Sequence, residues 1–199
     1  MNFFEWRVAR LTPVFCVLLS GCIGSPYLGE LGALQDELEP LQEAGTRGEA
    51  ALPVSGTAEY LGVMTISTFA GELGLSDRRI LYGAMDVSAD FSNGGAVTGG
   101  VQDVESLGGD AYEGALTITS GQMDAAANMT FLAEDDYSLL GDMSGTLTDS
   151  LGEAVVLDGT VTGRVWGEQA EILETFFDGT VVADGRHGLA FGEGALAAQ

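Results

Sequence analysis

Few side chains in this 199-residue chain could carry out covalent or acid–base chemistry. The single histidine, His187, stands between the turn-forming pair Asp184-Gly185 and Gly188, which is typical of a solvated turn residue. Carboxylates are plentiful, but no nucleophile stands beside a base as in a known catalytic motif. The acidic run Glu134-Asp135-Asp136 lacks the spaced ligands and the glycine of an EF-hand loop. We therefore expect no enzymatic activity, no metal and no cofactor.

One group of aromatic residues could form a ligand site. Trp166 stands two residues after Arg164 and close in sequence to Phe176 and Phe177. Apolar ligand sites gather aromatic side chains with a few polar groups, so these three aromatic residues are candidates for lining a binding mouth. The alternative, which we favour, is that they pack in the core or plug one end of the fold.

The segment Leu19-Ser20-Gly21-Cys22 could carry a covalent lipid. It closes a short apolar run that follows a charged stretch of about ten residues. The run is too short to cross a bilayer as a helix of roughly 20 residues and is typical of a signal peptide. The four residues resemble the lipobox of bacterial lipoproteins. The resemblance implies cleavage after Gly21 and acylation of Cys22, whereas the alternative is an ordinary signal peptide that happens to end near a cysteine.

The expected location of the protein in the cell follows from the same resemblance to a lipobox. Ile23 follows the cysteine where an inner-membrane retention signal would place aspartate. We expect lipid anchoring in the outer membrane of a Gram-negative bacterium, on its periplasmic face or at the cell surface. The lipid on Cys22 would be the contact with the membrane.

The composition of residues 22–53 predicts an acidic linker. It would join the signal peptide (residues 1–21) to a folded domain (residues 54–199). Within the linker, leucines recur at spacings of three and four residues, a helical pattern; they are Leu31, Leu34, Leu38 and Leu41. Pro40 interrupts this pattern, so a short helix is expected to end or kink near Glu39.

The charge of the chain restricts its partners. The sequence has 30 Asp+Glu and seven basic residues, and its formal net charge is -23. Such a surface repels phosphates, so nucleic acid is not an expected partner. Solubility or a saline habitat explains the acidity more simply than an acidic binding site. With Cys16 in the signal peptide and Cys22 acylated, no thiol remains for a disulfide or a zinc site.

From Val54 onward the sequence alternates between apolar and polar residues, as half-buried antiparallel strands do. Strands are expected near 55–67, 82–92, 96–104, 111–120, 126–132, 138–148, 155–167 and 174–184, with a short tail strand near 188–193. An apolar-polar-Gly-Thr-apolar pattern recurs at 143–147, 157–161 and 177–181, with glycine on the apolar face where a small sheet curls. The prediction is an all-β fold, a small eight-stranded antiparallel up-and-down β-barrel.

Three groups of residues, taken in order, carry a family resemblance. They are Gly56-x-Ala58-x-Tyr60-x-Gly62; Ala89-Asp90-Phe91 leading to Val97-x-Gly99; and Gly163-x-Val165-x-Gly167 before Phe177-x-Gly179-Thr180. This order resembles the β-barrel domain of transferrin-binding protein B-like lipoproteins. The resemblance implies an eight-stranded antiparallel barrel acting as a surface or periplasmic binding module. The single barrel and short loops depart from the large receptors of that family, so transferrin binding is not implied.

The expected partners are therefore the membrane, through the lipid, and a protein or small-molecule ligand at the barrel mouth or loops. Two alternatives stay open at this point. One is a lipocalin-like carrier of a small apolar ligand, and the other is a structural envelope lipoprotein without a discrete ligand. The sequence carries no signal for an oligomeric state.

Overall fold

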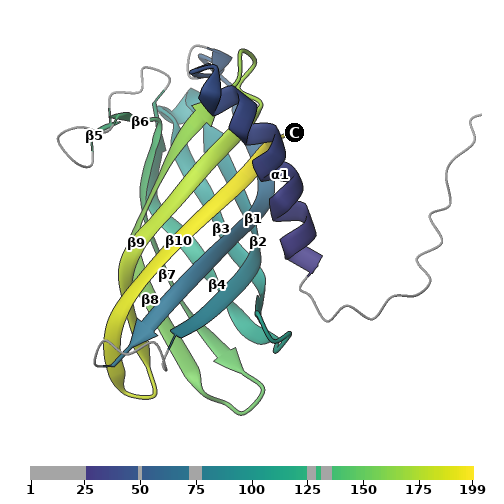
Figure 1. Ribbon diagram of the computed structural model, residues 1–199. Coiled ribbons are helices and arrows are strands. Elements are labelled where there is room, and N and C mark those ends of the chain that lie inside the picture. The colour runs from purple at the N-terminus through teal and green to yellow at the C-terminus, as the bar shows by residue number, and fades with distance from the viewer. Residues whose placement is uncertain (1–25, 49–50, 72–77, 125–128, 131–135) are drawn as a thin grey trace, which may run out of the picture.

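The computed structural model describes residues 26–48, 51–71, 78–124, 129–130 and 136–199, and within them it shows a closed antiparallel barrel (Figure 1). The barrel strands are β1 (Thr57–Ala70), β2 (Arg78–Asp90), β3 (Ala96–Ser106), β4 (Tyr112–Met123), β7 (Leu139–Asp149), β8 (Ala154–Trp166), β9 (Ile172–Ala183) and β10 (Arg186–Ala198). Each barrel strand pairs with the next one along the chain, and β10 pairs with β1 to close the barrel. The predicted eight-stranded up-and-down barrel is confirmed.

Two strands differ from the prediction. The short tail strand expected near 188–193 is the full-length β10, because its inward-facing glycines show no apolar alternation in the sequence. The described part of the segment expected as a strand near 126–132 is β5 (Met129–Thr130), which is not part of the barrel. It pairs with β6 (Asp136–Tyr137) in a separate two-stranded sheet between β4 and β7. The remainder of that segment lies outside the described residues.

Side chains of alternating residues fill the barrel interior. Large side chains from several strands are 2% exposed or less; they include Met64, Met85, Leu139, Met143 and Phe177. Gly159 and Gly179 face each other across β8 and β9. A Cβ on Gly159 would lie 2.9 Å from the Phe177 ring, and one on Gly179 would lie 2.8 Å from it. The ring therefore packs over the glycine pair, and the inner face is a core of the kind expected for eight strands.

Apolar residues cover the end of the barrel where β1 begins. Leu52 and Ala170, at 4% and 5% exposure, belong to the same core cluster as Tyr60 on β1. Burial, followed by the charge of Glu171, raises the pKa of Tyr60 to about 12. The phenol, which any tyrosine keeps neutral at physiological pH, therefore stays neutral at alkaline pH as well, and it packs as a largely apolar group.

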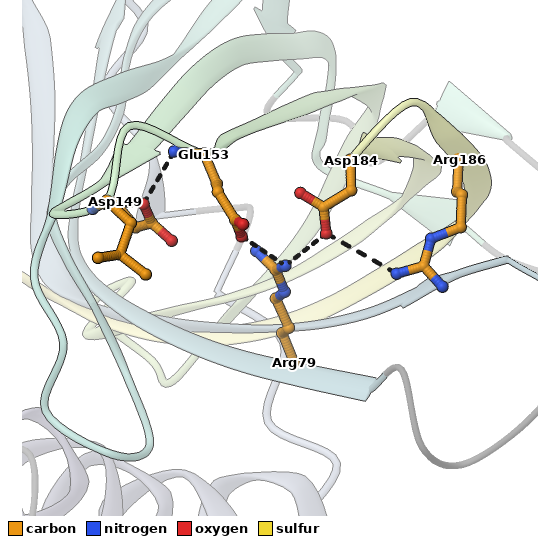
Figure 2. A network of polar contacts seen from close by, with 6 residues as sticks. Arg79, Asp149, Glu153, Asp184 and Arg186 are labelled. Carbon is orange, nitrogen blue, oxygen red and sulfur yellow. Dashed lines mark hydrogen bonds and ion pairs between the residues drawn. The ribbon is translucent and has the colours of Figure 1, made fainter.

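Ion pairs cover the opposite end of the barrel (Figure 2). Arg79 Nη2 lies 3.0 Å from Asp184 Oδ2 and 3.6 Å from Glu153 Oε2, and Arg186 Nη2 lies 3.7 Å from the same oxygen of Asp184. The backbone N–H of Glu153 donates to Asp149 Oδ1 at 2.9 Å, which fixes the turn between β7 and β8. These charged side chains are 28–49% exposed, so each pair contributes only about 0–1 kcal/mol. The network covers the core and adds little stability.

Helix α1 (Pro26–Glu43) lies on the outer wall of the barrel, mainly over β1 and β10 (Figure 1). Its inward side buries Leu34 and Leu38. Near its first turn, Tyr27 Oη donates a hydrogen bond to the carbonyl oxygen of Asp103 on β3 at 3.0 Å. Within the described residues, no helix is long and apolar enough to cross a membrane.

Pro40 lies inside this helix, which continues to Glu43, so of the two outcomes expected near Glu39, an end or a kink, the end is wrong. Proline removes one hydrogen bond from a helix interior. Leu38 and Leu41, on either side of the proline, belong to the apolar cluster beneath the helix. We attribute the continuation of the helix to this packing, which offsets the lost hydrogen bond. The amide of Ala44 donates to the carbonyl of Pro40 at 3.0 Å and completes the last turn.

Candidate functional site

Trp166 belongs to the contact between α1 and the barrel. Its side chain, 9% exposed, packs with Leu38 and Ile172 on the outside of the barrel wall. Its Nε1–H donates to Glu174 Oε2 at 2.9 Å, and the guanidinium carbon of Arg47 lies 5.3 Å from the ring centroid. Trp166, the last residue of β8, is thus enclosed by the helix and by polar groups on the outside of the barrel wall.

The structure also separates Phe176 from Phe177. Successive residues of a strand point to opposite faces, so the side chains of these neighbours on β9 lie on opposite sides of the barrel wall. Phe177 lies in the barrel core, whereas Phe176 lies on the outer wall. The three aromatic candidates are therefore in three different environments. Cys22 lies outside the described residues, and His187 is exposed near the β9–β10 turn.

Phe176 lines a groove of about 550 Å³ on the outer wall, which we call the outer-wall groove. The groove crosses β1, β10, β9 and β8, and the strand register arranges its floor in two transverse rows. The first row consists of Thr65, Glu193, Phe176 and Thr162. The second row consists of Ser67, Phe191, Asp178 and Thr160. The first strand of the barrel and its last three strands thus contribute to one surface.

An arginine lies over an aromatic ring at each side of the outer-wall groove. On the β2 side, the guanidinium carbon of Arg78 lies 5.7 Å from the centroid of Phe69. On the β8 side, the guanidinium carbon of Arg164 lies 4.8 Å from the centroid of Tyr137 and 6.0 Å from that of Phe176. These cation–π contacts hold the rings at the rims of the groove.

The floor of the groove offers both apolar and charged groups to a ligand. Phe191 is 43% exposed, although it also contacts Phe69 edge-on with the ring centroids 6.4 Å apart. Asp178 and Glu193 are exposed, and neither forms an ion pair with any residue that the structure describes. The hydroxyl oxygen of Thr65 is buried and has no hydrogen-bond partner among those residues. Such a surface is suited to binding a ligand that is partly apolar and partly polar.

Sequence reasoning did not identify Phe191, Asp178 and Glu193 as site residues. The available signal was the phase of the alternation, because Phe176 falls in phase with the polar residues Glu174 and Asp178 of the same strand. An aromatic residue in the polar phase of a strand predicts an apolar spot on the solvent face. Across the described part of the chain, no cluster of three or more acidic, histidine or cysteine side chains could hold a metal ion.

Comparisons with known proteins found little similarity. No family model matches the chain, and no curated protein matches it. Among solved structures, a variant of the vaccine antigen transferrin-binding protein B from Haemophilus parasuis aligns with 76% of this chain at 13% identity and a TM-score of 0.38. The aligned region spans 28% of that protein. A likeness of this size assigns the chain to no family.

Proposed function

We propose that this chain is a lipoprotein of the Gram-negative outer membrane, anchored through a lipid on Cys22, whose barrel binds a protein or solute in the outer-wall groove. The observation that carries the binding role is the exposed ring of Phe191, which lies between carboxylates that have no ion-pair partner among the described residues. Phe191 and Phe176 are diagonal neighbours in this groove, and an apolar patch rimmed by polar residues is typical of a binding site.

Two features of the described residues favour this role over a lipocalin-like carrier and over an enzyme. A lipocalin-like carrier needs space inside the barrel, but the inner side chains are buried against one another in a continuous core. An enzyme using two carboxylates needs different environments to keep one protonated and the other ionised. Asp178 and Glu193 are both exposed to solvent, which supports binding without catalysis.

A photo-crosslinking residue at position 191 tests the binding role in living cells. Because Phe191 is 43% exposed inside the groove, the probe is expected to form a discrete adduct of higher mass with the bound ligand. Val156 is the matched control, since it is 41% exposed on β8 but does not line the groove. Adducts detected by mass spectrometry at position 191 and not at 156 would support the proposal. No adduct at 191, or the same adducts at both positions, would refute it.

The lipid anchor has its own test. The Cys22→Ala variant is expected to lack the acyl mass and to move from the membrane fraction to the soluble fraction. Cys16→Ala is the control, because Cys16 lies within the expected signal peptide and should leave the lipid in place. Intact-protein mass spectrometry and cell fractionation measure both effects. An acyl mass that persists on Cys22→Ala would show that the lipid is attached elsewhere.

A further inference from the structure

We infer that the outer-wall groove recognises an extended basic peptide segment of a partner protein, with two cationic side chains placed two residues apart. The inference rests on the proposed binding role of the groove and specifies its ligand. It is drawn from the pattern of charges and rings on two neighbouring strands, β9 and β10.

At the centre of the groove, acidic and aromatic side chains alternate both along each strand and across the strand pair. Phe191 faces Asp178 across the strand pair, and Glu193 faces Phe176. The two carboxylates therefore occupy one diagonal of a square and the two rings occupy the other. Diagonal neighbours of this kind lie about 7–8 Å apart on one face of an antiparallel pair. This square places the acidic groups at a regular spacing with an apolar surface beside each of them.

An extended peptide matches that spacing. Its residues i and i+2 point to the same side and lie about 6.6–6.8 Å apart, since each residue advances the chain by about 3.3–3.4 Å. Two arginine or lysine side chains in these positions could therefore reach both carboxylates at once. Their aliphatic portions would lie across Phe176 and Phe191, where the ring faces also attract cations.

The groove carboxylates differ from Glu174 and Asp184, whose oxygens already have partners. Glu174 accepts hydrogen bonds from Trp166 and Gln42, and Asp184 pairs with arginines at the end of the barrel. In contrast, Asp178 and Glu193 pair with no cation within the described ranges. A basic ligand would supply the missing countercharge.

The charge of the whole chain favours the same class of partner. A net charge of -23 attracts basic segments over a distance and repels acidic ones, and this steering weakens as salt rises. Exposed pairs at a binding surface contribute mainly to association rate and specificity. The inference therefore predicts a ligand whose affinity falls steeply with ionic strength.

Synthetic peptides test the spacing directly. The first probe carries Arg-Thr-Arg at the centre of a short threonine- and valine-containing peptide, and the second carries Arg-Arg-Thr in the same context. Adjacent residues of an extended peptide point to opposite sides, so the second probe can place only one arginine in the groove. A third probe replaces both arginines of the first by neutral citrulline. Calorimetry at low and high salt is expected to show the tightest, most salt-sensitive binding for Arg-Thr-Arg.

Variants of the full chain locate the binding. The double variant Asp178→Asn/Glu193→Gln is expected to bind the Arg-Thr-Arg peptide about five- to tenfold more weakly, the scale of two exposed ion pairs. Glu113→Gln/Asp142→Asn is the control, because it changes the net charge equally at exposed positions on β4 and β7 outside the groove. Equal weakening by both variants would mean that only overall charge matters and would overturn the inference.

The outcomes also separate this inference from the proposed function. Equal affinity for all three peptides, together with groove-specific crosslinks at position 191, would leave the binding role intact and assign the groove to a neutral ligand such as a glycan. Arg-Thr-Arg binding that depends on Asp178 and Glu193, without crosslinks in cells, would support the peptide chemistry and refute the cellular role.

Discussion

Replacement of Phe177 by alanine is expected to lower the free energy of unfolding by about 3–5 kcal/mol. The ring is 2% exposed and packs over the paired glycines Gly159 and Gly179, which have no side chains to fill the space it would leave. A loss of this size is a large part of the stability of a typical domain, about 5–15 kcal/mol. Thermal unfolding followed by circular dichroism should show a decrease in Tm of about 6–20 °C.

Phe176→Ala is the matched control for that prediction, since it makes the same chemical change one residue earlier. Phe176 lies on the outer wall and its contact with Arg164 is 6.0 Å from guanidinium carbon to ring centroid. We expect a loss of about 1 kcal/mol or less. If the two variants lost similar stability, Phe176 and Phe177 would not lie on opposite faces as the structure places them.

Replacement of Leu38 by aspartate is expected to release α1 from the barrel wall. Leu38 is 6% exposed in the cluster with Trp166 and Ile172, so the substitution would place an unpaired charge against apolar side chains. Because the helix can detach, the cost is limited to the loss of docking, about 2–3 kcal/mol for the buried leucine. The fluorescence of Trp166 should shift to longer wavelength as water reaches the ring.

The measurement is made on the chain from Cys22 onward, in which Trp166 is the sole tryptophan. Gln35→Asp is the control, since it introduces the same charge at an exposed position of the same helix. It should leave the emission unchanged. A shift of equal size in both variants would show that added charge, and not the loss of the Leu38 contact, perturbs the tryptophan.

Much of the fold could be predicted from the sequence because an up-and-down barrel repeats one local rule. Apolar residues in every second position place one face of each strand in the core, and turn pairs such as Asp184-Gly185 join neighbours with positive φ angles of 53° and 70°. The full length of β10 was not predicted by this rule, because its inner face carries the glycines Gly188, Gly192 and Gly194 in place of large apolar residues. Packing in three dimensions, not local propensity, explains why α1 continues through Pro40.

The candidate site was less accessible to prediction. Closeness in sequence grouped Trp166 with Phe176 and Phe177, although strand geometry alone separates the last two. The groove depends on registers that align residues from β1, β8, β9 and β10, including the pair between the first and last strands of the barrel. Alternation predicts which residues face outward. It does not specify which of them become neighbours.

The docking of α1 limits how far the barrel of the proposed lipoprotein could move from its lipid anchor. Four peptide units separate Cys22 from Pro26, and they can span at most about 14 Å. If residues 26–47 were instead an unfolded chain, they could add up to roughly 75 Å to the distance between the lipid and the barrel. In the proposed lipoprotein, the docked helix would hold most of the linker against the barrel and would keep the groove close to the bilayer. Because the groove would stay near the bilayer, it would bind mainly partners that lie in the same membrane or close to it.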